Sequence, residues 1–430
     1  MAVTTAIVRA AANLALGTQD FTVAGFGTCK AAIFIMTRAI ADDVAADGAD
    51  FSYGATDGIS QFSVTATSED GQASSDTNKS ISVTVCAKLL LPGTVNVDGA
   101  ASFDSFITDG VRIDWINTLA SASLLTVILL GGDDLSAFVG SQLLGDVQDT
   151  VHTVNNVGFE SHLVLAALSD AENIASPTGS GYEYSVGAIH NDASGGVTPR
   201  SYIINDQNNQ ATTIINLYFS TLYGGGKILA GGAFDWGAEF SNFNATGFDI
   251  TERNAGANNT LIFYLCLRGA SPDDFAVGTY STPTGLGENS ETGPDFKPQL
   301  VMLGMTHAPS VDTGVSDENA GTVGVAAFTD TAEFANSNSM EDDSVGTNTQ
   351  SLSAARAIES PLDDGLTGIS ADFVSMDTLG YTLDYSSVLA AARQFWYAAI
   401  KAEPSGQGDV FTEHPWTVPT MYYLPYWKHR

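Results

Sequence analysis

An internal repeat is the feature that most constrains what this chain can fold into. A strand-like signature recurs at residues 25–37, 158–166 and 295–306. Each copy carries a phenylalanine at the same place, Phe26, Phe159 and Phe296, and these lie 133 and then 137 residues apart. This period gives each copy enough chain to bury a core of its own.

Three further landmarks recur in the same order at nearly the same spacing. They are a short strand with a central glycine (Gly54, Gly187, Gly324), a glycine before a strand (Gly110, Gly247, Gly380) and a closing apolar strand (residues 125–130, 262–267 and 395–400). Identity between the copies is low, and only the apolar pattern and the turn glycines recur. Core packing and turn geometry demand those features, so we predict three tandem copies of one domain.

The apolar runs are short, and Gly, Asp, Asn or Ser bounds them, as is typical of strands. Examples are residues 201–204, 213–219 and 81–86, and the last alternates apolar and polar residues as a half-buried strand does. Residues 386–400 could be helical by composition, but the repeat aligns 395–400 with two clear strands. We therefore predict an all-β chain of three tandem β-sandwich, jelly-roll-like repeats with an extended aromatic C-terminal tail.

The landmarks also suggest domain boundaries. The expected parts are an N-terminal arm (1–20), repeat 1 (21–145), repeat 2 (150–280), repeat 3 (290–403) and a docking tail (404–430). The copies differ most in the polar stretches 67–80, 205–209 and 336–349. Such stretches are typical of exposed loops on a scaffold.

The tail is rich in aromatic residues and prolines. Its expected assembly residues are Trp416, Tyr422, Tyr423, Tyr426 and Trp427. Prolines keep such a segment extended, and a free aromatic segment is an aggregation hazard. We expect the tail to dock, either on its own chain or on a neighbouring subunit, and its basic end at residues 428–430 suits an acidic surface.

Composition narrows the class of protein. Hydrophobic residues make up 44% of the chain and charged residues 15%, which is typical of a folded protein. The net charge of −33, without a Lys/Arg cluster, argues against nucleic acid as a partner. No run of 18 apolar residues or signal peptide is apparent, so we expect no membrane insertion and folding in a cytoplasm. Cys29, Cys86 and Cys266 are expected to be buried thiols.

No catalytic motif was found, and we expect no catalytic, cofactor or metal site. Gly-rich residues 224–227 lack the spacing of a phosphate loop, and the histidines lack metal-ligand spacing. Three acidic clusters, at residues 42–50, 133–134 and 341–343, are expected to be solvated loops. Calcium binding or glycan hydrolysis are the alternatives for them.

The opening strand of the third copy reads Phe296-Lys297-Pro298-Gln299-Leu300-Val301. It resembles modules of tailed-phage virion proteins, although Thr28 and Ser161 replace the proline in the other copies. The resemblance implies a non-enzymatic structural protein of the tail, a fibre or baseplate component in contact with a host-surface glycan. It implies assembly in the host cytoplasm, location in the virion, other virion subunits as partners and a homo-oligomer. A capsid decoration or head-spike protein, and a carbohydrate-binding or glycan-active protein, are the alternatives.

Overall fold

The protein is described by a computed structural model. It describes residues 3–145, 147–171, 178, 181–211, 213–229, 231–254, 260–316, 321–341, 347–362 and 368–402. These residues are almost entirely β-strand, which confirms the predicted all-β class. The one helical element in the described ranges is a single 3-10 turn, η1 (Pro272–Asp274).

The strands fall into three sets, which we call units 1, 2 and 3. Unit 1 contains β1 (Thr4–Ala11), β2 (Gly17–Thr22), β3 (Cys29–Thr37), β4 (Ala46–Asp47), β5 (Ala49–Thr56), β6 (Gln61–Ser68), β7 (Thr77–Ser82), β8 (Ala87–Leu90), β9 (Val97–Ile107), β10 (Gly110–Asn117) and β11 (Leu124–Gly131). Unit 2 contains β12 (Ser136–Leu144), β13 (Val151–Val154), β14 (Leu163–Ser169), β15 (Tyr182–Asn191), β16 (Val197–Asp206), β17 (Ile215–Ser220), β18 (Gly226–Ile228), β19 (Phe234–Asn244), β20 (Gly247–Arg253) and β21 (Thr260–Arg268). Unit 3 contains β22 (Phe275–Ser281), β23 (Gly287–Glu291), β24 (Pro298–Thr306), β25 (Gly314–Ser316), β26 (Gly321–Phe328), β27 (Glu333–Met340), β28 (Thr349–Ala354), β29 (Ile358–Ser360), β30 (Ile369–Asp377), β31 (Gly380–Ser387) and β32 (Gln394–Lys401).

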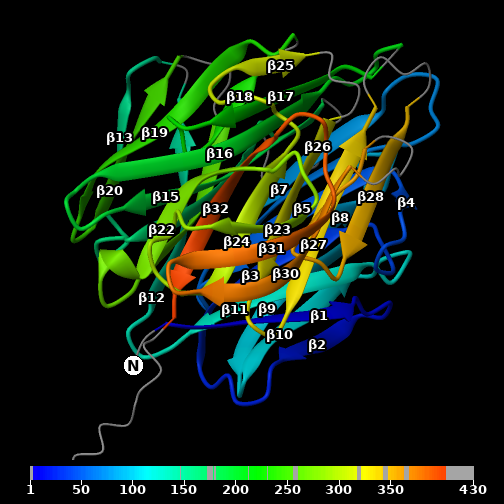
Figure 1. Cartoon of the computed structure of the whole chain (residues 1–430). Helices are drawn as coiled ribbons and strands as arrows, with labels where there is room; N and C mark the ends of the chain where they lie inside the picture. Colours follow the sequence, from blue (N-terminus) through cyan, green and yellow to red (C-terminus); the bar gives the residue numbers. More distant parts are fainter. Residues whose placement is uncertain are drawn as a thin grey trace, which may run out of the picture.

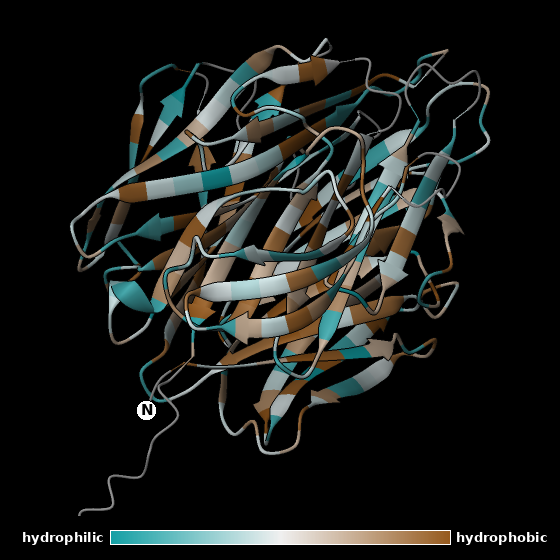
Figure 2. Ribbon diagram, in the orientation of Figure 1, coloured by the Kyte–Doolittle hydropathy of each residue, from teal (hydrophilic) through white to brown (hydrophobic). Residues whose placement is uncertain are grey.

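Each unit pairs its strands in the same order. The large sheets run β1-β11-β3-β5-β6-β7, β12-β21-β14-β15-β16-β17 and β22-β32-β24-β26-β27-β28, and the four-stranded sheets run β2-β10-β9-β8, β13-β20-β19-β18 and β23-β31-β30-β29. The large and small sheets of a unit enclose a core of their own, around Trp115, Trp236 and Tyr381 respectively. Figure 2 shows apolar bands, in brown, along the strands of the molecule.

The recurring glycines have a common structural reason. A side chain at Gly110, Gly247 or Gly380 would collide with the backbone carbonyl of the neighbouring strand β2, β13 or β23. At Gly54 and Gly187 it would collide with a carbonyl just ahead of β8 or β18, where the chain crosses to the small sheet. The absence of a Cβ therefore allows close backbone approach at the same places in successive units.

The three units form a closed ring. A short insert between the third strand and the next long strand of each unit pairs with the last strand of another unit's large sheet. Insert β4 of unit 1 pairs with β28 of unit 3, insert β25 of unit 3 pairs with β17 of unit 2, and Thr178 of unit 2 bridges Lys79 on β7 of unit 1. Figure 1 shows β25 along β17 at the top and β4 beside β28 at the right. Each unit thus gives one insert and receives one.

A fourth apolar core lies between the units and draws residues from all three large sheets. Phe51 of unit 1 stacks on Tyr184 of unit 2 with ring centroids 4.7 Å apart. In unit 3 the corresponding strand, β26, begins with Gly321, where a Cβ would collide with Ile215 of unit 2. Two units thus contribute large side chains to the shared core, and the glycine of the third unit leaves room for a side chain of its neighbour, as close packing requires.

The strand pairing places the edges of the three units about one strand away from the expected domain boundaries. The expected arm 1–20 contains β1 and most of β2, which pair with β11 and β10 inside unit 1. The expected boundaries place β12 in repeat 1 and most of β22 in repeat 2, whereas β12 pairs with β21 of unit 2 and β22 pairs with β32 of unit 3. All three first strands lie at sheet edges, and β1 and β12 bury few residues completely, so the apolar signal of these two is weak.

Two local predictions have different outcomes. Residues 395–400 lie in β32, so the strand interpretation is confirmed. Residues 81–86 are not one strand, because β7 ends at Ser82 and β8 begins at Ala87 in the other sheet. The alternating pattern there belongs to a crossing between sheets, with Val83 exposed on the way.

Candidate functional site

The predicted assembly tail lies outside the described residues. This applies to Trp416, Tyr422, Tyr423, Tyr426 and Trp427. Its docking therefore stays a prediction.

The acidic clusters are only partly the solvated loops that the sequence predicted. Asp50 is fully buried, and Arg38 bonds to it and to Asp98. Burial raises the pKa of Asp50, while the Arg38 charge opposes that shift. Of the third cluster only Glu341 is described. In the described ranges no three His, Cys, Asp or Glu residues are grouped as metal ligands.

The cysteine prediction is confirmed, since Cys29, Cys86 and Cys266 are buried free thiols. Burial raises the pKa of Cys29 and of Cys266 to about 12. Of the histidines, His307 is buried and its ring contacts the hydroxyl of Ser360 at 2.9 Å. His162 is buried against the edge of Phe275 of unit 3.

The ring junctions are the sites that bring distant polar residues together. At the junction of units 1 and 2, the Lys79 ammonium lies 2.8 Å from Glu183 and 3.7 Å from Asp170. Lys227 approaches the same two carboxylates. Burial alone would lower the pKa of Lys227, but the two carboxylates outweigh it and raise that pKa. Two cations and two anions therefore neutralise one another where strand β7 meets unit 2.

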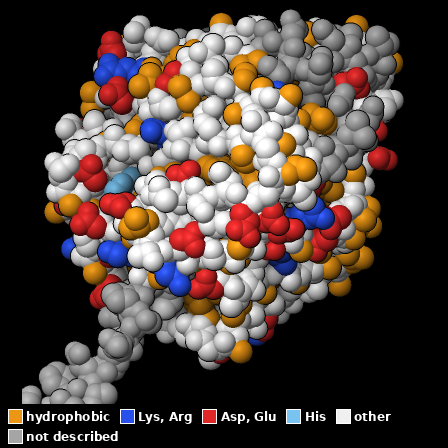
Figure 3. All heavy atoms as spheres, viewed as in Figure 1, with side chains coloured by type: hydrophobic (Ala, Val, Ile, Leu, Met, Phe, Trp, Pro, Cys, Tyr) orange, Lys and Arg blue, Asp and Glu red, His pale blue; other side chains and the backbone are white. Residues whose placement is uncertain are grey.

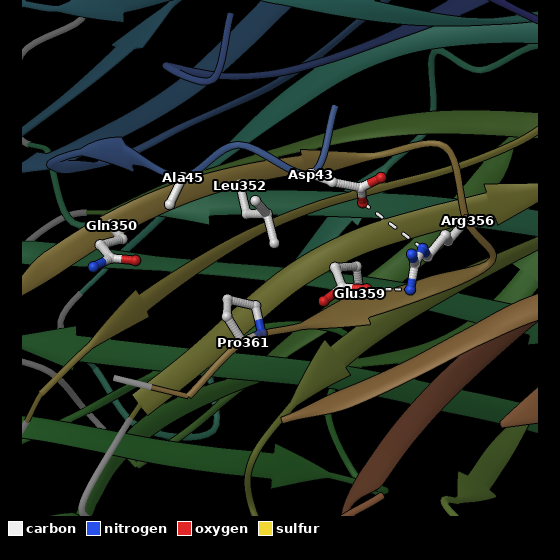
Figure 4. Close-up of a pocket in the computed structure, with 7 residues that line it drawn as sticks. All are labelled: Asp43, Ala45, Gln350, Leu352, Arg356, Glu359 and Pro361. Carbon is white, nitrogen blue, oxygen red and sulfur yellow. Dashed lines mark hydrogen bonds and ion pairs between the residues drawn. The ribbon is translucent and has the colours of Figure 1, made fainter. Parts of the chain in front are cut away.

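The junction of units 1 and 3 encloses a polar pocket of about 150 Å³ (Figure 4). Arg356 points between Asp43 of unit 1 and Glu359 of unit 3, at 3.7 and 3.5 Å. Ser370 accepts a hydrogen bond from Arg356 and donates one to Glu359, at 2.6 and 2.7 Å. Burial raises the pKa of Glu359, and the Ser370 bond and the Arg356 charge oppose that shift. The guanidinium links acids of both units, which suits a junction held by ion pairs.

Three turns, one from each unit, bond to one another. The turn after β6 meets the turn after β16, where Asn209 donates to the Ser75 carbonyl at 2.7 Å. The same turn of unit 1 meets the end of the turn after β27, where Gly71 donates to the Thr347 carbonyl at 2.7 Å. The Thr213 hydroxyl donates to the Glu341 carbonyl between units 2 and 3. These are the polar stretches that we expected to be exposed loops, and they bury part of one another instead.

The surface carries mixed charge. Figure 3 shows acidic side chains scattered over one face, several of them beside a Lys or Arg. The described part of the chain holds no helix with the length and apolarity needed to span a membrane.

Sequence reasoning missed the junction residues because they come from different units. Lys79 and Glu183 are 104 residues apart, and neither stands in a motif. The available signal was weak: Lys79 is a lysine within an otherwise uncharged strand.

No protein-family model, no curated protein and no solved structure matches the chain.

Proposed function

We propose that the chain is a non-enzymatic structural component of a phage virion, and that it belongs to the tail as a fibre or baseplate protein that contacts a host-surface glycan. The observation that carries the proposal is the closed ring, in which each unit gives one strand insert and receives one. The resemblance of residues 296–301 to virion modules supports the same class.

A ring of three similar units fits a structural role for a physical reason. Symmetric assemblies present the same surface several times around an axis. This chain presents three similar sandwiches in one covalent unit, which fixes their ratio and places them around a shared apolar core. The ring thus suits a neighbour with threefold symmetry, while the differing loops allow the units to make different contacts.

The second candidate is a capsid decoration or head-spike protein. The same ring favours it, because a shell also offers threefold positions. The partners in either case are other virion subunits, and the place of action is the virion.

Purified virions of the phage that encodes the chain provide the test. We expect quantitative mass spectrometry to find the chain at a fixed ratio to the major capsid protein after stringent washing. Electron microscopy with an antibody to the chain should label the tail, and an antibody to the major capsid protein serves as the control. Labelling of the head would favour the second candidate. Absence of the chain from washed virions would overturn the structural role.

A further inference from the structure

We propose that unit 1 contains a binding site for a small monocarboxylate with a linear apolar chain, in which Lys88 binds the carboxylate and an apolar pocket takes the chain. This inference does not depend on the proposed virion role. It concerns a pocket of about 420 Å³ at the edge of the unit 1 sandwich, whose surface is largely apolar although Ser82, Thr84 and Asn117 also line it. Its lining residues include Lys88, Val85, Val97, Ala100 and Ile116.

The fold creates the pocket where the chain crosses between sheets. Strand β7 ends at Ser82, the crossing passes Val83, and β8 begins at Ala87 in the small sheet. Strands β8, β9 and β10 form one wall, and Ser82, Thr84 and Val85 form another. Ala87 and Leu89 face the sandwich core, so the alternation of the strand turns Lys88 the other way.

Lys88 is an unusual residue for such a place. It is only 7% exposed, and a charged amine is seldom buried to this degree without a counter-ion. Its ammonium donates to the Ser80 hydroxyl at 2.6 Å, and no ion pair joins it to a carboxylate among the described residues. An ammonium has three donors, so a ligand oxygen can accept from it.

The neighbouring charged groups are engaged elsewhere. On β9, Asp98 pairs with Arg38 at 3.2 Å. On β7, Lys79 pairs with Glu183 across the junction with unit 2. On β10, Arg112 pairs with Asp20. Burial, without a compensating acid, lowers the pKa of Lys88 to about 8, so the amine is largely protonated at neutral pH.

The apolar pocket surface and the buried Lys88 ammonium together indicate the class of ligand. A carboxylate supplies the missing negative charge and accepts from the ammonium in a charge-assisted hydrogen bond. An apolar chain covers Val85, Val97 and Ile116. Each methylene that leaves water strengthens binding by about fourfold. Affinity should therefore rise with chain length until the pocket is filled.

The test is a titration of the full-length protein with acetate, butanoate, hexanoate and octanoate, followed by ligand-observed NMR at pH 7. We expect the dissociation constant to fall with chain length by about fourfold per methylene up to a limit, and hexanol to bind at least tenfold more weakly than hexanoate. K88M should lose at least tenfold in hexanoate affinity. K30M, which removes a lysine of the same unit whose ammonium bonds to Asp133 and Leu135 carbonyls, should leave it unchanged.

Two further measurements separate a specific site from a loss of folding or from general apolar binding. I116S changes a half-exposed wall residue and should weaken hexanoate severalfold while leaving acetate unchanged. Raising the pH well above 8 should weaken hexanoate binding, since Lys88 then loses its proton. Equal binding of hexanol and hexanoate, equal binding by K88M, or no binding of any acid at millimolar concentration would each overturn the proposal.

Discussion

Replacing Lys88 with methionine should stabilise the protein at neutral pH. On folding, burial lowers the pKa of Lys88 from 10.5 to about 8. At ~1.36 kcal/mol per pKa unit, the charged lysine reduces the free energy of unfolding by about 3 kcal/mol. Methionine has a similar shape and no charge. It leaves the buried Ser80 hydroxyl without its donor, which costs about 1–3 kcal/mol.

The expected gain for K88M at pH 7 is therefore about 0–2 kcal/mol. The double variant K88M/S80A also removes the orphaned hydroxyl and should gain more, up to about 3 kcal/mol. Both gains should be measured by urea unfolding monitored by tryptophan fluorescence.

The pH dependence of the gain identifies its cause. Below pH 8 the lysine is protonated in both states, so the full cost is present. Between pH 8 and 10.5 the unfolded state holds more protons than the folded state, so wild-type stability rises with pH relative to the variant. Above 10.5 the lysine is neutral in both states, so the cost of its buried charge disappears. The reasoning is refuted if both variants are less stable than wild type at pH 7, or if their advantage is the same at pH 10.5.

Four further predictions follow from the packing. E183Q leaves the buried Lys79 ammonium with only the more distant Asp170 and should destabilise the protein by about 3 kcal/mol in urea unfolding. The exposed pair of Arg253 and Asp149 is its control, since D149N should cost less than about 1 kcal/mol; equal losses would contradict the importance of the junction. G110A places a methyl group against a β2 carbonyl and should lower the thermal midpoint, at a cost of about 1–3 kcal/mol or more; an unchanged midpoint would show that the strands can separate there. The three buried thiols should not react with a thiol reagent at pH 8 in the native protein and should all react in denaturant; fast native labelling would contradict their burial. Light scattering should find an oligomer for the full chain and a monomer after deletion of residues 403–430, and a monomer in both cases would remove the tail from assembly.

The sequence predicted what depends on local pattern. Short alternating or apolar runs indicated strands, and the closing run at 395–400 is a strand despite its helical composition. The glycines at 110, 247 and 380 stood out because backbone contact excludes a side chain there in each unit. The same patterns failed at the edges, where β1 and β12 bury too little surface to leave a clear signal.

Local sequence patterns could not predict the Lys88 pocket or the pocket at the junction of units 1 and 3. Nothing in the sequence distinguishes Lys88 from the other lysines. Its burial depends on the crossing between β7 and β8, and the alternating pattern of residues 81–86 had predicted a single strand at that place. The pocket in Figure 4 likewise joins Asp43 to Arg356, which are more than 300 residues apart.

The sequence by itself determined that the chain is all β and where most of its strands lie, because strand formation and glycine placement depend on the side-chain pattern and on contacts between nearby strands. Only the tertiary structure decided that the units close into a ring. The inserts that close it are β4, Thr178 and β25, and they are too short to carry a periodic signal. Their pairing becomes favourable only when the three large sheets already share an apolar core, which brings strands from distant parts of the chain to hydrogen-bonding distance.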